Sequence, residues 1–176
     1  NIDVEYARSK GIHVINTPAS SSESVAELVF AHLFTGIRFL HDSNRNMPLE
    51  GDTNFENLKK AYANGIELRG KTLGIIGMGR IGKAVARMAI GLGMKVIYSD
   101  VHIPHKDLKI HFFDGQTICI SLSSQSLESL FAAADFITLH VPAQDNYVIG
   151  EKDFELMKDG VGIINCARGG AIDEVA

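Results

Sequence analysis

Residues 72–82 read TLGIIGMGRIG, and this stretch decides the fold. An apolar run typical of a buried strand leads into the spacing GxGxxG, and a helical periodicity follows it. In such a strand–turn–helix unit, Gly77 permits the tight turn, Gly79 lets backbone N–H groups approach a pyrophosphate, and Gly82 lets the helix pack closely on the strand. The helix N-terminus at Arg80 adds partial positive charge for the phosphates. The stretch predicts a dinucleotide site; a strand-to-helix turn without a ligand is the alternative.

Strands and helices alternate after residue 70, which is typical of a parallel α/β sheet. Apolar runs predict strands at Thr72–Ile76, Lys95–Ser99, Phe136–His140 and Gly162–Asn165. Helical periodicity predicts helices at Arg80–Gly91, Ser126–Ala134 and Lys152–Met157. The stretch Val101–Leu122 is the hardest to assign, with Thr117–Ser121 as a further short strand. The expected fold class is α/β, a Rossmann-like doubly wound parallel sheet that is incomplete at both ends.

The first 64 residues follow other patterns. A short helix is expected around Val4–Lys10, a strand at Ile12–Ile15, and a polar arm at Asp42–Asn64 that contains a short helix near Phe55–Tyr62. Between these segments, Ser24–Leu40 has the periodicity of a long amphipathic helix, and capping-box spacings occur at Ser20 to Glu23 and Ser24 to Glu27. Apolar residues also lie off its main stripe, namely Phe30, Phe34 and Phe39. The helix is therefore expected to be buried on two sides or to contact another subunit.

Composition excludes several classes of protein. The chain has 176 residues, of which 45% are hydrophobic and 22% charged, enough for one domain core. The net charge of −4 and the scattered basic residues argue against nucleic acid as a partner. No apolar run reaches the roughly 18 residues of a membrane span and no signal segment opens the chain, so a soluble cytoplasmic protein is expected.

Neither a disulfide framework nor a metal site is expected. Cys119 and Cys166 lack the CxxC spacing that suggests zinc binding. His102, His105 and His111 lie in one stretch without other ligands at suitable spacing, so a solvated loop is favoured there.

Three strand ends carry residues suited to the same ligand. Asp100 follows the second strand at about 20 residues from the glycine turn, where a carboxylate binds the adenosine ribose and repels a 2′-phosphate. NAD rather than NADP is therefore expected, and a turn or cap residue is the alternative. His140-Val141-Pro142 and Asn165–Gly170 follow two further strands and are expected to face the same crevice.

Arg168, within the last of these segments, is suited to binding a substrate carboxylate. Its guanidinium can make a bidentate contact and polarise an adjacent carbonyl, whereas a structural ion pair is the alternative. Cys166 is expected to be a small buried residue rather than a nucleophile, because no partner base is evident.

Together these motifs resemble the D-isomer-specific 2-hydroxyacid dehydrogenase family. The resemblance rests on Asn16-Thr17-Pro18, Ala26-Glu27, the run Leu68–Gly82, Asp100, His140–Pro142 and Asn165–Gly170. It implies NAD as the cofactor and Arg168 as the catalytic, substrate-binding residue. The residues expected to bind the cofactor are Gly77, Gly79, Arg80, Ile81, Gly82, Asp100, His140, Val141, Pro142, Cys166, Ala167 and Arg168.

The resemblance also implies a reaction, the transfer of a hydride between nicotinamide and C2 of a D-2-hydroxy acid or 2-oxo acid. Within the family the motifs are most similar to the D-3-phosphoglycerate dehydrogenases, which implies oxidation of D-3-phosphoglycerate in serine biosynthesis. Val141 stands where relatives often have Thr. The family's catalytic Glu and His follow the last motif, so we expect an internal piece of a longer protein. Residues 1–17 would belong to the substrate domain and hinge, and residues 18–176 to the NAD-binding domain.

Two other functions are compatible with part of this pattern. The same family includes NAD-binding transcriptional corepressors, which recruit partner peptides instead of turning over a substrate. An adenosylhomocysteinase-like NAD domain is disfavoured by the Ala167–Gly170 turn. Because dimers in the family form through the cofactor domain, residues 20–64 are expected to contact a second copy in a homodimer or higher homo-oligomer.

Overall fold

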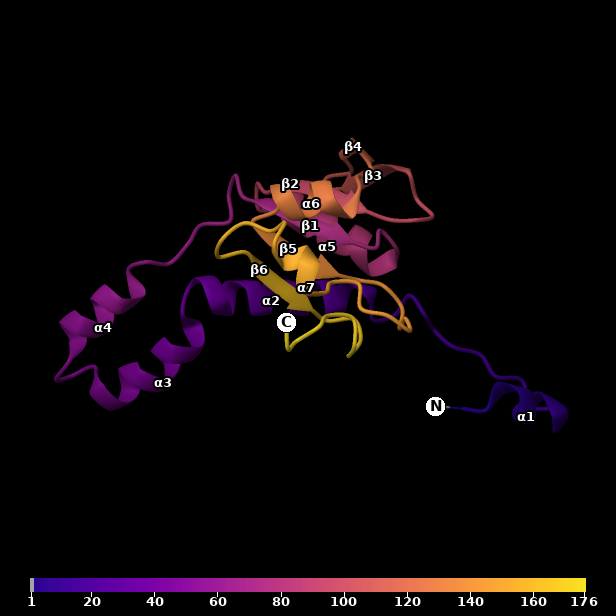
Figure 1. The fold of residues 1–176 in the computed structure, drawn as a ribbon, viewed down its shortest axis with the longest axis horizontal. Helices are drawn as coiled ribbons and strands as arrows, with labels where there is room; N and C mark the ends of the chain where they lie inside the picture. Colours follow the sequence, from indigo (N-terminus) through magenta and orange to yellow (C-terminus); the bar gives the residue numbers. More distant parts are fainter. Residues whose placement is uncertain (1) are drawn as a thin grey trace.

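The computed structural model describes residues 2–176, and at its centre lies a parallel sheet of four strands (Figure 1). The strands are β1 (Thr72–Ile76), β2 (Lys95–Ser99), β5 (Phe136–Leu139) and β6 (Gly162–Asn165), in the order β2-β1-β5-β6. β5 is buried along its whole length, and β1 is buried from Leu73 onward. Because the strands are parallel, their carboxyl ends meet at one edge of the sheet, as the sequence predicts.

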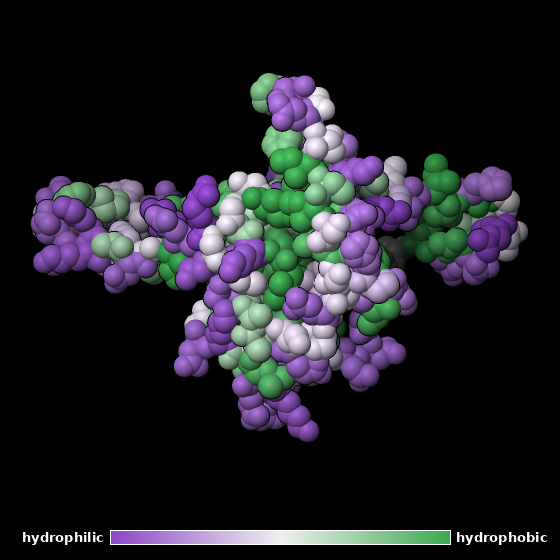
Figure 2. Space-filling view, turned by 90° about the horizontal axis from the view of Figure 1, so that it is seen from above, coloured by the Kyte–Doolittle hydropathy of each residue, from purple (hydrophilic) through white to green (hydrophobic). Residues whose placement is uncertain are grey.

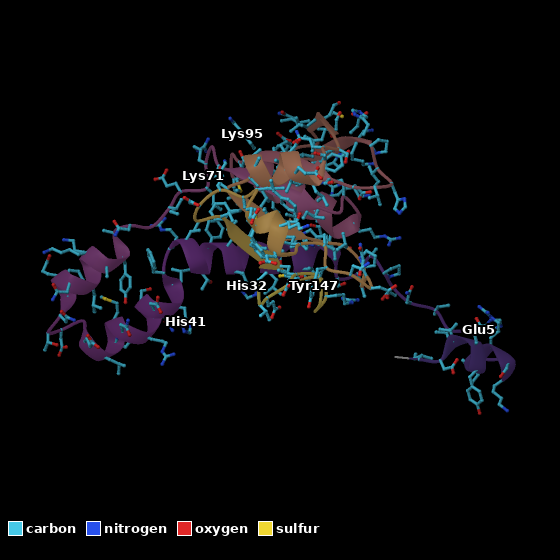
Figure 3. All side chains as sticks on the ribbon, in the orientation of Figure 1. Glu5, His32, His41, Lys71, Lys95 and Tyr147 are labelled. Carbon is cyan, nitrogen blue, oxygen red and sulfur yellow. The ribbon has the colours of Figure 1, made fainter. Side chains whose placement is uncertain are left out.

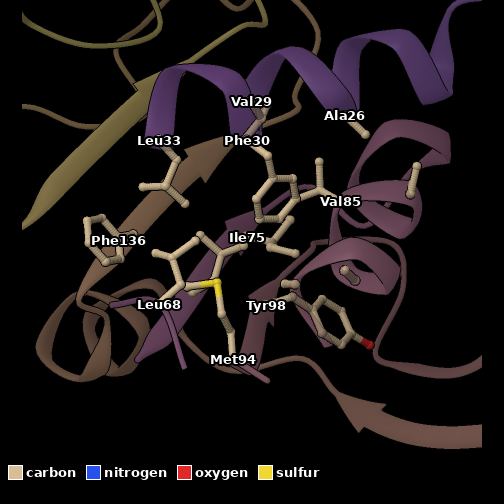
Figure 4. Packing of buried hydrophobic residues seen from close by; sticks show 14 of the residues in the cluster. Ala26, Val29, Phe30, Leu33, Leu68, Ile75, Val85, Met94, Tyr98 and Phe136 are labelled. Atoms are coloured by element: carbon tan, nitrogen blue, oxygen red, sulfur yellow. The ribbon is translucent and has the colours of Figure 1, made fainter. Parts of the chain in front are cut away.

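Helices cover both faces of this sheet, which confirms the doubly wound arrangement. One face packs against α2 (Ser22–Ile37) and α5 (Arg80–Gly91), and the opposite face packs against α6 (Leu127–Ala133) and α7 (Glu151–Phe154). Figure 4 shows the first core, which includes Val29, Phe30, Leu33, Ile75, Val85 and Tyr98. The second core includes Leu130, Phe131, Ile137, Leu139 and Ile149. The helix predicted at Lys152–Met157 corresponds to α7, which begins one residue earlier and ends earlier, at Phe154.

Helix α2 differs from its prediction in both its ends and its buried face. It ends at Ile37, because Phe39 adopts a left-handed conformation with φ 53° that redirects the chain. Neither capping box forms, and the Ser20 hydroxyl donates instead to the Thr17 carbonyl at 2.8 Å. Phe30 is 6% exposed and belongs to the core, so its assignment to a surplus apolar surface is wrong.

The chain then forms a projecting pair of helices, α3 (Leu40–Glu50) and α4 (Phe55–Tyr62), which we call the arm (Figure 1). The prediction of α4 is confirmed, whereas the loop expected before it is largely the helix α3. The Asn46 amide donates to the Tyr62 hydroxyl at 2.9 Å and so ties the two helices together. The surface of the arm is mostly hydrophilic (Figure 2).

The N-terminal segment contains α1 (Val4–Ser9), close to its expected position. Figure 1 shows it at the end of an extended segment, away from the sheet. The strand expected at Ile12–Ile15 is not formed, and Ile15 is 90% exposed. An extended apolar run becomes a strand only when a neighbouring strand satisfies its backbone groups, and the four-stranded sheet provides no partner here.

The stretch after β2 forms an antiparallel hairpin, β3 (His105–His111) and β4 (Thr117–Ser123), which we call the ribbon. The strand expected at Thr117–Ser121 is confirmed, and its partner β3 was not predicted. One face of β3 carries Leu108, which is 1% exposed and packs into the core beside α5. Among residues 2–176, no helix has both the length and the apolar character that crossing a bilayer requires.

Candidate cofactor and substrate site

The turn between β1 and α5 has the geometry that its three glycines predict. Gly77 has φ +96°, and a Cβ atom there would lie 2.6 Å from the His140 carbonyl oxygen. A Cβ atom on Gly82 would collide with the Gly77 carbonyl oxygen, so the helix and the strand approach too closely for any side chain. At Gly79, by contrast, a Cβ atom would meet nothing within 4 Å. The space above Gly79 can therefore hold a phosphate against the backbone.

The N-terminus of α5 also fits an anionic group. Gly79 is its N-cap residue and supplies no side-chain acceptor, and the first turn contains no acidic residue. The N–H groups of that turn keep their partial positive charge, which favours a phosphate at this position.

Asp100 lies beside this turn and is held by backbone groups. One carboxylate oxygen, Oδ2, accepts from the Met78 N–H at 2.7 Å, and Oδ1 accepts from the N–H groups of His102 and Ile103 at 2.8 and 3.0 Å. The Ser124 hydroxyl accepts from the Asp100 N–H at 2.9 Å. Because Oδ2 makes one of these bonds and has two lone pairs, it can accept a ribose hydroxyl as well.

The end of β5 adjoins the same turn. The strand ends at Leu139, one residue earlier than predicted, but the His140 N–H still donates to the Ile76 carbonyl at 2.8 Å. His140 Nε2 lies 3.1 Å from the Thr138 hydroxyl, and its Nδ1 is buried without a partner among residues 2–176. Burial lowers the pKa of His140 to about 4, so its imidazole is neutral at pH 7. Val141 comes next, 3.2 Å from where a Cβ atom on Gly77 would lie.

The turn after β6 is shaped by Asn165. Its side-chain amide donates to the Arg168 carbonyl at 2.9 Å, and its Oδ1 accepts from the Ala167 N–H at 3.0 Å. Arg168 is exposed and donates to the Ala167 carbonyl; no ion pair described for residues 2–176 includes it. Cys166 is half-buried against the core, and burial raises the pKa of its thiol. These contacts favour a structural Cys166 and a free Arg168 guanidinium.

The three strand ends thus lie at one edge of the sheet, as expected, but several residues that shape them were not singled out from sequence. Tyr98 donates from its hydroxyl to the Ile103 carbonyl at 3.0 Å and so fixes the loop after Asp100. Ser124, Thr138 and Asn165 similarly position Asp100, His140 and Arg168. Asn165 begins the segment that the sequence assigns to the crevice, but its role in shaping the turn was not predicted; the available signal is an Asn at the end of a strand, which often bonds the backbone of the following turn. In the described part of the chain, no cluster of three or more His, Cys, Asp or Glu residues could hold a metal.

Comparison with known proteins identifies the family of this chain. Residues 30–176 match the profile described as "D-isomer specific 2-hydroxyacid dehydrogenase, NAD binding domain". The chain belongs to the D-isomer-specific 2-hydroxyacid dehydrogenase family. This confirms the resemblance seen in the motifs, and the open cradle at Gly79 and the uncapped α5 fit the dinucleotide that this domain of the family binds.

Individual relatives of this dehydrogenase domain have different names. The chain is 42% identical to a hydroxypyruvate reductase of Thermotoga maritima and 41% identical to a D-3-phosphoglycerate dehydrogenase of Methanocaldococcus jannaschii. Both comparisons cover 100% of this chain, but 52% and 31% of those proteins. The structure of Aquifex aeolicus D-lactate dehydrogenase with NAD and lactic acid matches 98% of this chain and 48% of that one, with TM-score 0.68 and 35% identity. The chain therefore spans about half the length of these relatives or less.

Proposed function

We propose that the protein containing this chain is an NAD-dependent oxidoreductase that interconverts a D-2-hydroxy acid and its 2-oxo acid, with D-3-phosphoglycerate and 3-phosphohydroxypyruvate as the pair. The observation that carries the proposal is the meeting of the glycine turn, Val141 and the Arg168 turn at one edge of a sheet whose family is established. The identity to a D-3-phosphoglycerate dehydrogenase supports the substrate pair. The similar identity to a hydroxypyruvate reductase makes hydroxypyruvate the substrate to test against it.

Each strand end would have its own part in this reaction. The turn from Gly77 to Gly82 would hold the pyrophosphate, and Asp100 would accept hydrogen bonds from the adenosine ribose. His140, Val141, Pro142, Cys166 and Ala167 would line the remainder of the dinucleotide. NAD, when bound, supplies the acceptor for the hydride. Arg168 would bind the substrate carboxylate and polarise the adjacent carbonyl, because its guanidinium has no carboxylate partner within residues 2–176.

The test is a substrate comparison with the full-length protein. Oxidation of NADH is followed by absorbance with 3-phosphohydroxypyruvate, hydroxypyruvate, glyoxylate and pyruvate, and the kcat/KM values are ranked. We expect turnover with all four and the highest kcat/KM for the phosphorylated substrate. A higher value for hydroxypyruvate would contradict the assigned pair but keep the reaction class. NAD binding without any turnover would instead support the corepressor function.

We also propose that α2 and the arm contact a second copy of the chain. Phe30 lies in the core and is not available for this contact, but Leu40, Leu49 and Phe55 of the arm are exposed and α3 has no buried residue. A helix with so little burial of its own is usually stabilised by packing against something else. Light scattering at tens of micromolar should show a dimer, and a monomer without concentration dependence would contradict this interface.

A further inference from the structure

The strand β4 is an edge strand that lacks the residues by which proteins usually protect such an edge. It is exposed along most of its length and lies on the outside of the molecule, beyond β2 (Figure 1). Its sequence, TICISLS, contains no charged residue and no proline. Its partner β3, by contrast, carries Lys106, Asp107 and Lys109. An exposed, uncharged edge strand that contains β-branched residues is a favourable place for another strand to pair.

The hydrogen-bond pattern of the ribbon shows which backbone groups of β4 are free. The Phe112 N–H donates to the Gln116 carbonyl at 2.9 Å, so these two residues form a hydrogen-bonded pair. Because the two kinds of pair alternate along an antiparallel ribbon, Lys109 and Cys119 form a pair whose backbone groups point away from the ribbon. The Lys109 carbonyl agrees with this pattern, since it accepts from Arg87 Nε at 3.0 Å.

The same alternation gives three residues of β4 outward N–H and C=O groups, namely Thr117, Cys119 and Ser121. All three residues are exposed, and their outward groups have no backbone partner within residues 2–176. The edge closes further along, where Ser124 bridges to Tyr98 of β2. The open part of the edge is therefore residues 117–121, and its free donors and acceptors suit another strand.

The inner face of the ribbon adds apolar surface beside this edge. Leu108 is 1% exposed and packs into the core beside α5, whereas Phe112 is 45% exposed and Ile118 is 51% exposed. The register of the ribbon places these three side chains on one face. The core therefore covers the base of that face and leaves its outer part open. Because a two-stranded ribbon alone is marginally stable, the outer part gains from further strand pairing.

We propose that β4 pairs antiparallel with β4 of a second copy, so that the two ribbons join into one four-stranded sheet. A partner strand needs no charge to match, because β4 carries none, and β4 of a second copy is such a strand. Pairing all three outward residues places the two-fold axis at Cys119, with Thr117 opposite Ser121 of the partner subunit. Ile118 then lies opposite the partner's Ile120, and the apolar faces of the two ribbons become continuous.

This contact is separate from the one proposed for α2 and the arm. The ribbon adjoins β2 and lies far from the arm in Figure 1, so one copy can use both surfaces at the same time. With both contacts, association proceeds beyond a dimer. The dinucleotide crevice has no part in either contact, and the proposal does not depend on the activity of the protein.

Hydrogen exchange of the full-length protein tests the pairing directly. The outward amides of Thr117, Cys119 and Ser121 exchange fast in a single copy. We expect their protection to rise about tenfold or more as the protein concentration increases from about 1 to 100 μM. The amides of Ile118 and Ile120 are the control, because they bond to β3 in a single copy and in the pair, and they should change much less.

Two substitutions at Cys119 separate pairing from folding. Cys119→Glu faces Lys109 within the ribbon, which favours the single copy, but it meets its own carboxylate across the two-fold axis. We expect it to weaken association about tenfold or more, with partial recovery at high salt. Cys119→Val keeps an uncharged side chain and is the matched control, with nearly unchanged association. Urea unfolding checks that both variants remain folded.

Chemical cross-linking gives a third measurement. A short bismaleimide should join two copies of the original protein through Cys119, which is exposed, and should not join Cys119→Val. Leu49→Glu, on the exposed side of the arm, is the control for the other contact and should leave this cross-link in place.

Four results would overturn the proposal. Two are equal association in Cys119→Glu and Cys119→Val, and the absence of the cross-link. A third is exchange at the outward amides that stays fast at every concentration. The fourth is protection of these amides that is already complete at the lowest concentration, because another segment of the full-length chain would then cover β4. Association that is lost in Leu49→Glu but unchanged in Cys119→Glu would assign the contact to the arm alone and would count against β4 as well.

Discussion

Every residue of β5 is buried. In the described structure of the arm, residues 40–62, the only buried hydrophobic side chain is that of Leu58. The ends of β1 and β5 are therefore positioned by the two cores on either side of the sheet. Within the arm, Asn46 contacts Tyr62, and the Tyr62 ring also lies against Phe39, the residue that joins α2 to the arm. Core packing therefore fixes the crevice edge, whereas the stability of the arm depends on contacts outside the two cores.

The glycine turn should give the largest effect on stability. Gly77→Ala would place a residue with a side chain at a positive φ, with its Cβ atom 2.6 Å from the His140 carbonyl oxygen. The free energy of unfolding should therefore fall by about 3 kcal/mol or more. Gly79→Ala is the control, because that position has φ −70° and open space, and it should cost about 1 kcal/mol or less. Urea unfolding compares the two. Equal losses would show that the crevice edge adapts and is not rigid.

Acidification should reveal the buried imidazole of His140. Its pKa is about 4 in the folded chain against 6.5 when exposed, so between these values the unfolded chain binds the additional proton. The free energy of unfolding should therefore fall as pH drops from 6.5 to 4, by roughly 3 kcal/mol for this group.

His140→Asn removes this titration and should flatten the stability curve in that pH range. His41→Asn is the matched control, because His41 lies exposed on the arm (Figure 3). An unchanged slope in His140→Asn, measured by urea unfolding at several pH values, would contradict the role of burial here.

Substitution of Arg168 distinguishes a role in substrate binding from a role in stabilising the fold. In the full-length protein Arg168→Ala should lower kcat/KM at least tenfold, about 1.4 kcal/mol, because a charge-assisted bond to the carboxylate is lost. The melting temperature and the affinity for NAD should stay nearly the same, since the guanidinium contacts the Ala167 carbonyl alone. Arg69→Ala is an exposed control remote from the crevice. A large fall in melting temperature with little kinetic effect would support a structural role.

The same contrast explains what could be predicted from sequence. The strands of the sheet and the glycine turn were predictable because burial and backbone geometry permit few residue types there. The strand β3 was not, since its first three residues, His105–Asp107, are all polar, its alternation begins only at Leu108, and its pairing with β4 is a tertiary choice. Phe30 was misplaced because two apolar stripes on α2 compete, and only the position of α5 decides which is buried. The contacts of Ser124 and Tyr98 depend on segments distant in sequence and left no local pattern.

The smallest effect is expected in the arm, where Leu58→Ala removes its one buried apolar side chain, 8% exposed. Because the arm has little contact with either core, the substitution should lower the opening energy of α3 and α4 by about 1 kcal/mol and leave the global unfolding energy nearly unchanged. Leu73→Ala, in the centre of β1, is the matched control and should cost about 3 kcal/mol globally. Native-state hydrogen exchange separates the two, because arm amides report the local opening and β1 amides the global one. If Leu58→Ala lowers the opening energy of the arm and the global unfolding energy equally, the arm folds with the sheet as one unit. If arm amides become more protected as protein concentration rises, the missing contacts come from a second copy of the chain.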